Sequence, residues 1–251
     1  RSLMHQNIHI SVITICKNEE ATIERTIRSV GRQSFPHIEH VIIDGQSTDG
    51  TLDVIKRYEQ CRLISEPDAG IYDAMNKGVQ AAEGDFLLFI NAGDYLIHDR
   101  VLEKCVSLIS TAPETIDIFF GNIFFYNAID GSGWMWRPAR RSRLSMFMGC
   151  LPHPATFFSR HSFEKNGPFD TSFQIAGDYE WFVRGMEKKH LSFQHIDTLV
   201  SLFNQDGGVS TRPEMHELHE REKQKIYHMH YSALDRKRFR VGVFFKKNFK
   251  F

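Results

Sequence analysis

The sequence has no net charge, few cysteines and no long apolar run, and each of these absences excludes a class of protein. The 31 Lys and Arg residues balance 31 Asp and Glu residues, so no overall field draws nucleic acid to the chain. No apolar run approaches the ~20 residues that a helix needs to span a bilayer. The four cysteines are far apart and form no C-x-x-C pair, which argues against a zinc site or a disulfide framework and fits a reducing cytoplasm.

The remaining composition is that of a globular protein. Of the 251 residues, 41% are hydrophobic and 25% are charged, which is enough chain for one large core or two small ones. The first residues, Arg1 to Met4, resemble a remnant of cloning ahead of a native start, and we expect no signal peptide. We therefore expect the protein to act in the cytoplasm.

An apolar segment of strand length, Phe86 to Ile90, ends abruptly in Asn91-Ala-Gly-Asp94. Its residues are aliphatic or β-forming, as in a strand buried on both faces, and Gly93 permits a tight turn beyond it. The segment predicts that Asn91 and Asp94 lie at the carboxyl end of a central parallel strand, the edge where open α/β sheets bind ligands. The alternative is an ordinary turn that caps the next helix, because Asn, Gly and Asp are common turn residues.

The first hundred residues alternate between strands and helices. We expect strands at residues 8–15, 39–43 and 62–65, because each is rich in apolar, often β-branched residues and leads into polar ones. Apolar residues at helical spacing predict a helix after the first strand, and residues 71–83 predict another. Alternation at this spacing indicates βαβ units and a parallel sheet.

The second half of the chain has strands without helices between them. Residues 116–120, 123–126, 193–196 and 199–203 are strand-like, which suggests antiparallel additions and hence a mixed sheet. From Glu214 onward the chain is helical and polar. Four histidines stand in this part, and they are His216, His219, His228 and His230. Because Glu and Lys residues surround them, we expect a solvated helix face rather than a metal site.

Four segments occur in a recognisable order and spacing, and they are Ser11 to Asn18, Val41 to Thr51, Asp68 to Gly78, and Phe86 to Asp94. With them the chain resembles the family 2 glycosyltransferases over roughly residues 8–210. The Asp-Gly-x-Ser-x-Asp-Gly-Thr element within the second segment is quite specific. The resemblance implies the α/β GT-A fold, a mixed and mainly parallel sheet flanked by helices, and inverting transfer of a sugar from a nucleotide-sugar.

The resemblance also implies how the chain is divided. A GT-A domain is expected over residues 1–213, with a donor half at about 8–98 and an acceptor half at about 99–213. A C-terminal helix and a basic, aromatic tail are expected over residues 214–251.

Besides Asn91, four residues are candidates for binding the donor. The resemblance implies that Asp44 accepts a hydrogen bond from the base, uracil in relatives, and that Thr14 lines the same base pocket; otherwise Asp44 merely caps the following helix. Asp68 resembles the residue that contacts the nucleoside, although the proline before it also suits a type I turn. Lys77 is a candidate for neutralising phosphate, but a Lys on a solvated helix face is the commoner case.

Asp94 is the candidate metal ligand. The family's usual element is Asp-x-Asp, whose carboxylates bind Mn²⁺ or Mg²⁺; here Asn91 and Gly93 stand at acidic positions, and only Asp94 stays acidic. One carboxylate, diphosphate oxygens and water still complete an octahedral shell. Because a leaving diphosphate develops charge that has to be neutralised, the resemblance implies Mn²⁺ or Mg²⁺ as the cofactor, with Asn91 beside the donor.

Asp178 is the candidate general base. The segment Ala176 to Trp181 resembles the family's Glu-Asp element at the start of a helix, with Gly177 in place of the Glu. The resemblance implies that Asp178 accepts the proton of the acceptor hydroxyl, as inversion by in-line attack requires. The alternatives are that Asp178 merely caps the helix, or that Glu180, two residues on, is the base.

His153 and Asp206 are candidates for acceptor or lid residues. His153 lies where relatives place such residues, although a lone His is more often structural. Asp206 is followed by two glycines, which would let its loop close over the donor.

The tail, residues 236–251, holds seven Lys or Arg, five Phe and no acidic residue. We expect the cations to meet anionic lipid head groups while the Phe rings enter the interface. Alternatively, the Phe residues pack on the catalytic domain or on a second subunit. The hypothesis is a cytoplasmic enzyme, peripheral on the inner face of the plasma membrane, that moves a sugar from a UDP-sugar to a growing bacterial polysaccharide on a lipid carrier.

Two other functions compete with this hypothesis. A sugar-1-phosphate nucleotidyltransferase has a similar sheet, but it needs a Gly-rich basic loop after the first strand, and residues 14–20 contain no glycine. A non-catalytic nucleotide- or glycan-binding module is favoured by the reduced acidic motif and disfavoured by the retained Asp178.

Overall fold

A computed structural model describes residues 8–127, 129–138, 145, 149–206, 208 and 212–239 of the chain. In chain order the elements are β1 (Ile10–Cys16), α1 (Ile23–Gly31), β2 (Ile38–Asp44), α2 (Thr51–Ile55), β3 (Cys61–Ser65), α3 (Ile71–Ala81), β4 (Phe86–Phe89), β5 (Tyr95–Leu96), α4 (Val101–Ile109), β6 (Ile118–Tyr126), β7 (Gly133–Trp136), η1 (His153–Ala155), β8 (Thr156–Ser159), α6 (Arg160–Asn166), α7 (Gly177–Lys188), β9 (Phe193–Asn204), η3 (Pro213–Met215) and α8 (His216–His230).

Within the described residues, nine strands form one mixed sheet in the order β3-β2-β1-β4-β8-β6-β9-β5, with β7 paired to β6. β1 pairs in parallel with β2 and β4, and β2 pairs in parallel with β3. β8 runs antiparallel between β4 and β6, and β5 runs antiparallel to β9. The predicted mixed sheet, parallel in its first half, is confirmed.

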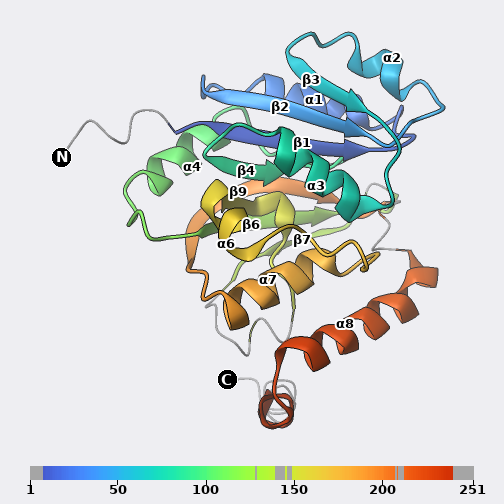
Figure 1. The fold of residues 1–251 in the computed structure, drawn as a ribbon. Coiled ribbons are helices and arrows are strands. Elements are labelled where there is room, and N and C mark those ends of the chain that lie inside the picture. Colours follow the sequence, from blue (N-terminus) through green and yellow to red (C-terminus); the bar gives the residue numbers. More distant parts are fainter. Residues whose placement is uncertain are drawn as a thin grey trace.

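Helices cover both faces of the sheet. α3, α6 and α7 lie on the face that is turned to the viewer, and α1 and α4 lie behind it (Figure 1). Because successive side chains of a strand point to opposite faces, Phe158 packs in the front core with Trp181, whereas Phe157 packs in the back core with Leu102. The strands between these two cores are buried on both sides, as the apolar run at Phe86 to Ile90 predicted.

The predicted breaks in the second half of the sheet are wrong, because β6 and β9 are each continuous. The two strands pair in parallel, and their register shifts between Phe120 and Asn122. At Gly121 a Cβ atom would lie 2.4 Å from Cγ2 of Val200, so the glycine marks a close approach of strands and not a loop. Polar residues remain inside the strands because they pair with each other: Asn122 Nδ2 donates to Asp197 Oδ1 at 2.8 Å.

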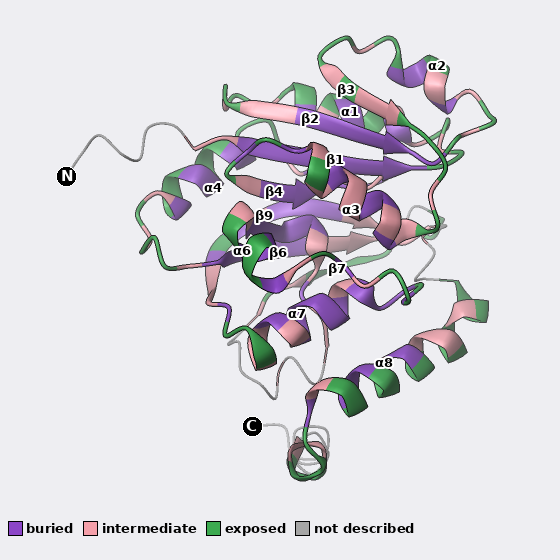
Figure 2. Cartoon of the chain, viewed as in Figure 1, coloured by how far each residue is buried: buried purple, intermediate pink, exposed green. Residues whose placement is uncertain are grey.

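The prediction of a fully solvated face for the C-terminal histidines is wrong for His230. Its side chain is only 7% exposed, and Ile226 and Tyr227 of the same helix belong to the front core. Figure 2 shows buried and exposed stretches alternating along α8. Within the described ranges, no helix combines the length and the apolar composition that crossing a bilayer requires. The predicted tail is described only as far as Phe239, and its other residues lie outside the described part.

Candidate active site

A cavity of about 230 Å³ is formed by the loops that follow β1 and β4, the end of β9 and the residues after it, and η1, together with the start of α3, the loop before α7 and the first turn of α7. It lies at the carboxyl ends of the parallel strands, as the sequence predicted. Its lining consists of Glu19, Thr22, Ile71, Tyr72, Asn91, Ala92, Gly93, Asp94, His153, Gln174, Ile175, Asp178, Phe203, Asn204, Asp206 and Gly208. Five predicted site residues meet here, and they are Asn91, Asp94, His153, Asp178 and Asp206.

Asp94 is held in a buried turn after β4. Gly93 takes a φ of +96°, a backbone conformation that favours glycine, and Arg25 Nη2 donates to its carbonyl at 2.7 Å. Only 3% of Asp94 is exposed, and its Oδ1 accepts a hydrogen bond from the N–H of Asn204 at 2.9 Å. Burial raises the pKa of the Asp94 carboxyl to about 7, against the opposing effects of the Asn204 N–H and the charges of His153 and Arg25.

His153 connects the turn that carries Asp94, the candidate metal ligand, to Asp178, the candidate general base. Asn91 Nδ2 lies 3.2 Å from His153 Nε2, and His153 Nδ1 lies 3.3 Å from Asp178 Oδ2. A proton on Nδ1 faces the Asp178 carboxylate in both the neutral and the charged ring, and in the neutral ring Nε2 accepts from Asn91. Asn91 Oδ1 is buried and has no hydrogen-bond partner among the residues that the structure describes. An acceptor oxygen of the cavity wall is therefore left for a ligand.

Asp178 is the second residue of α7 and is not the N-cap, which is Ala176. Its Oδ1 accepts hydrogen bonds from the Tyr179 N–H at 2.8 Å and the Tyr72 hydroxyl at 3.1 Å. Burial alone would raise the pKa of Asp178, but the hydrogen bond and charge of His153 and these two donors outweigh it, and the pKa falls below its ordinary 3.8. The carboxylate is thus ionised at neutral pH, and 18% of its side chain remains exposed.

The ring of Tyr72 explains why a glycine stands at position 177, where the family has Glu. A Cβ atom at position 177 would lie 2.7 Å from Cδ2 and Cε2 of the Tyr72 ring. The ring crosses the start of α7 at this point, and the single proton of its hydroxyl is shared between Asp178 Oδ1 and the carbonyl of Ile175, whose oxygen lies 2.5 Å from the hydroxyl. Burial raises the pKa of Tyr72 well above 10, so the hydroxyl keeps its proton and acts as a donor. A larger residue at position 177 would displace it.

Asp44 ends β2 and Asp68 lies in the loop after β3, and both are outside the lining of this cavity. Asp44 is fully buried and accepts hydrogen bonds from the Ser47 N–H at 3.1 Å and the Ser65 hydroxyl at 2.7 Å. Asp68 bends back over Gly45, where a Cβ atom would lie 2.1 Å from its Oδ2. The structure thus brings Asp68 close to Gly45, the residue that follows Asp44.

Thr14 and Lys77 are also outside the cavity lining, and both are engaged within the protein. The Thr14 hydroxyl is buried and donates to the Ile90 carbonyl at 2.7 Å. Lys77 Nζ pairs with Glu66 at 3.1 Å and with Asp73 at 3.3 Å. These contacts connect β1 to the end of β4, and the loop after β3 to α3.

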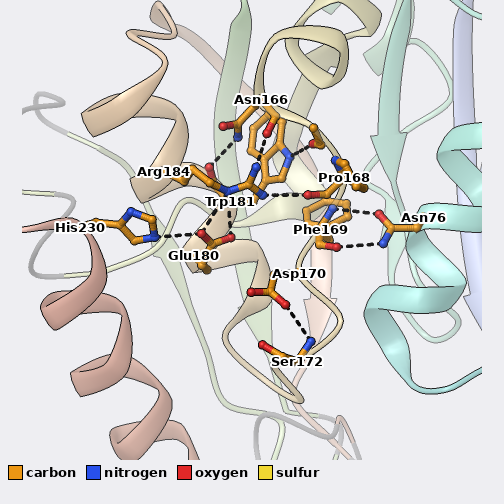
Figure 3. A network of polar contacts seen from close by, with 11 residues as sticks. Asn76, Asn166, Pro168, Phe169, Asp170, Ser172, Glu180, Trp181, Arg184 and His230 are labelled. Carbon is orange, nitrogen blue, oxygen red and sulfur yellow. Dashed lines mark hydrogen bonds and ion pairs between the residues drawn. The ribbon is translucent and has the colours of Figure 1, made fainter.

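Glu180 lies in a separate polar network that connects α7 to α8 (Figure 3). It is 1% exposed, and its carboxylate pairs with Arg184 at 3.0 Å and with His230 at 2.8 Å. Arg184 in turn donates to the Pro168 carbonyl at 2.7 Å. Glu180 therefore connects α7, α8 and the loop before α7, and it does not line the cavity.

Sequence reasoning missed two residues of the cavity that make defined contacts with its carboxylates. Tyr72 stands within a motif that had been recognised, but nothing local showed that its hydroxyl reaches a residue 106 positions away. Asn204 ends β9, and its N–H reaches Asp94 across 110 positions. A polar residue at the end of a strand was the only available signal.

Comparison with known proteins identifies the family. The model of glycosyl transferase family 2 matches residues 11–182, and this chain belongs to that family. A PGL/p-HBAD biosynthesis glycosyltransferase of Mycobacterium bovis is 28% identical over 205 residues, which cover 80% of this chain and 78% of that protein. The predicted family is confirmed, and it disfavours the nucleotidyltransferase alternative.

Solved structures agree on the fold. S. aureus TarS 1-349 in complex with UDP-GlcNAc superposes with a TM-score of 0.64 at 19% identity, over 81% of this chain and 60% of that one. The mannosyltransferase PcManGT from Pyrobaculum calidifontis, in complex with GDP-Man and Mn²⁺, superposes with a TM-score of 0.62 at 17% identity, over 81% of this chain and 59% of that one. The GT-A fold is confirmed, and the chain spans less than two thirds of either solved chain.

Proposed function

We propose that this chain transfers a sugar from a UDP-sugar to an acceptor hydroxyl, with inversion, in the assembly of a bacterial surface polysaccharide. The observation that carries the proposal is the ionised Asp178 carboxylate, which shares one cavity with Asp94. In-line displacement requires a base for the acceptor and a site that neutralises the leaving diphosphate. The likeness to TarS, whose complex holds UDP-GlcNAc, and to a biosynthesis glycosyltransferase supports the donor and the glycan product.

In the proposed reaction the acceptor hydroxyl gives its proton to Asp178 while its oxygen bonds to the anomeric carbon. The bond from that carbon to the diphosphate breaks, and its electron pair leaves with the diphosphate. Because Tyr72 and the Tyr179 N–H occupy Oδ1, we assign the proton transfer to Oδ2, which His153 orients. Attack then comes from the face opposite the leaving group, which is the origin of the inversion.

The residues around Asp94 fit a divalent cation that binds together with the diphosphate. The raised pKa of Asp94 and the Asn91 Oδ1 atom, which has no hydrogen-bond partner among the described residues, both indicate that the cavity wall offers buried oxygens to a cation. Among the described residues, no group of three His, Cys, Asp or Glu could hold a metal by itself. Asp94 and Asn91 would therefore share the ion with diphosphate oxygens and water, and Mn²⁺ or Mg²⁺ bound there would neutralise charge on the leaving group.

We assign the base and ribose of the donor to the region of Asp44 and Asp68. Asp44 is the last residue of β2, and Asp68 Oδ2 occupies the space that a side chain at Gly45, the next residue, would fill. Thr14 and Lys77 have protein partners, so we assign them a supporting role behind this region. His153 and Asp206 are assigned to the acceptor side, and Glu180 is left out of the site.

The acceptor is proposed to be lipid-linked, with residues 236–251 docking on an anionic membrane surface. The composition of this tail, seven cations and five Phe with no acidic residue, supports the proposal. An enzyme confined to the membrane plane meets a lipid-linked substrate more often than one free in solution.

Release of the nucleotide from UDP-, GDP- and TDP-sugars, with Mn²⁺ or Mg²⁺, tests the proposed function. We expect a UDP-sugar with metal to raise the melting temperature of the protein and to be hydrolysed slowly. Asp178→Asn should keep donor binding and lower turnover by about 10²-fold or more. Asp53→Asn, on the exposed side of α2, is the matched control and should behave as wild type. Wild-type protein that binds a nucleotide-sugar without ever releasing UDP would be the non-catalytic module instead.

A further inference from the structure

Helix α8 lies beyond residues 11–182, the part that the family model matches, yet it packs against the segment that carries Asp178. Glu222, Ile226 and His230 recur every four residues, so they share one face of the helix. This face is buried, whereas Met229 beside it is 45% exposed. The helix therefore presents a carboxylate, an apolar side chain and an imidazole to the segment at 172–180.

Glu222 binds the loop before α7. Its Oε1 accepts a hydrogen bond from the Gln174 N–H at 2.7 Å, and its Oε2 accepts from Ile175 at 3.0 Å and Ala176 at 2.9 Å. Three successive backbone N–H groups thus converge on one carboxylate that is 7% exposed. Bonds of this kind to an ionised acceptor are about twice as strong as neutral ones, so the loop conformation depends on Glu222.

The loop that Glu222 binds is part of the cavity. Gln174 and Ile175 line it, and the Ile175 carbonyl accepts the Tyr72 hydroxyl at 2.5 Å. The same hydroxyl reaches Asp178 Oδ1 at 3.1 Å. A displacement of the loop therefore changes the partner of Tyr72 and the start of α7 together.

We propose that Glu222 is a positioning residue for the transfer reaction, because it fixes the 174–176 loop and thereby the Tyr72–Asp178 pair. The inference rests on the proposed role of Asp178 as the base. Glu222 is not among the residues that line the cavity, so it acts through the loop. Two further contacts hold the same helix: Lys225 Nζ lies 3.1 Å from Ser172 Oγ, and His230 pairs with Glu180 (Figure 3).

The expected effect is on turnover and not on donor binding. Asp44 ends β2, Asp68 lies in the loop after β3, and neither contacts α8 in the described hydrogen bonds, so the KM for the donor should stay within about twofold of wild type. A misplacement of about 1 Å at a reacting group costs on the order of 10²-fold in rate. Glu222→Ala, which removes all three loop bonds, should therefore lower kcat by roughly 10- to 10²-fold.

The test uses the full chain with UDP-GlcNAc and Mn²⁺, and measures UDP release at a temperature well below every melting point. Glu222→Gln keeps the size and one carbonyl oxygen, so it should lose less kcat than Glu222→Ala. Glu220→Ala is the matched control, since that glutamate of α8 has a side chain that is 65% exposed and pairs only with Lys223, at 3.7 Å, among the described contacts. Hydrogen exchange of a peptide spanning residues 173–177 should accelerate in both Glu222 variants and stay unchanged in the control.

The outcomes separate this inference from the proposed function. Faster exchange in Glu222→Ala with wild-type kcat, while Asp178→Asn is inactive, would overturn the positioning role alone. A lower melting point with unchanged kcat would show a purely structural role and would also overturn it. If Asp178→Asn is as active as wild type, the proposed base is wrong and the positioning role falls with it.

Discussion

Replacing Gly177 by alanine would test the coupling between Tyr72 and Asp178 most directly. The new Cβ would lie 2.7 Å from two ring carbons of Tyr72, whereas ordinary contact begins at 3.4 Å, so the ring has to retreat by about 0.7 Å. The ring has little room, because Tyr72 is 4% exposed and packs against Phe169 with ring centroids 5.9 Å apart. Its hydroxyl, which donates to Asp178 and Ile175, has to move with it.

A shift of this size beside the base should lower kcat on the order of 10- to 10²-fold. The effect on stability should be smaller, because overpacking costs about 1–3 kcal/mol while Ala is favoured over Gly in a helix by ~1 kcal/mol. UDP release and a thermal melt measure the two effects. Gly31→Ala is the control, since its Cβ would meet Gln60 Nε2 at an ordinary 3.4 Å.

A double-mutant cycle shows whether displacement of the Tyr72 ring causes the loss of kcat. In a Tyr72→Ala background the ring is absent, so Gly177→Ala should cause little further loss of kcat. Wild-type kcat for Gly177→Ala, or an equal loss in both backgrounds, would refute the reasoning.

Three further predictions concern the donor, the metal and the tail. With a pKa of about 7, Asp94 is about 90% ionised at pH 8 and about 10% ionised at pH 6. Because a cation binds the ionised form, the metal-dependent affinity for a UDP-sugar should fall roughly tenfold from pH 8 to pH 6. Calorimetry should show no such change for Asp94→Asn, and full wild-type activity in EDTA would contradict the metal assignment. Asp44→Ala should weaken UDP binding and also lower the melting temperature, because it leaves the Ser47 N–H and the Ser65 hydroxyl without the Asp44 acceptor. Each hydrogen bond to a charged group contributes about 1.5–3 kcal/mol. Unchanged UDP affinity in an intact fold would remove Asp44 from the donor site. The full chain should co-sediment with anionic vesicles at low salt and be released at high salt, whereas a form ending at Ala233 should not bind; equal behaviour of the two forms would contradict the tail assignment.

Local patterns in the sequence determined much of the fold and part of the site. The apolar run at Phe86 to Ile90 predicted a strand buried on both faces, because such a strand carries no polar alternation. The polar residues after it, Asn91 and Asp94, were placed at the correct sheet edge, because parallel strands end at a common edge. His153 and Asp178 were found through the resemblance and not through any local pattern.

Helix α8 shows where sequence reasoning stopped. Its residues are mostly polar, so its pattern indicated a solvated helix, yet Glu222 and His230 are buried because each has a polar partner on the segment before or within α7. Burial of a charged group depends on what it meets, and the hydrophobic pattern contains no information on partners.

Only the tertiary structure decided which polar groups share the cavity. Thr14 and Lys77 belong to recognised motifs, but their own partners lie within the protein, while Tyr72 and Asn204 reach the two carboxylates across more than a hundred positions. Strand and helix periods are local properties of the chain. Contacts between distant side chains arise from the way the helices and strands pack, and the sequence specifies that packing only through all of its residues together.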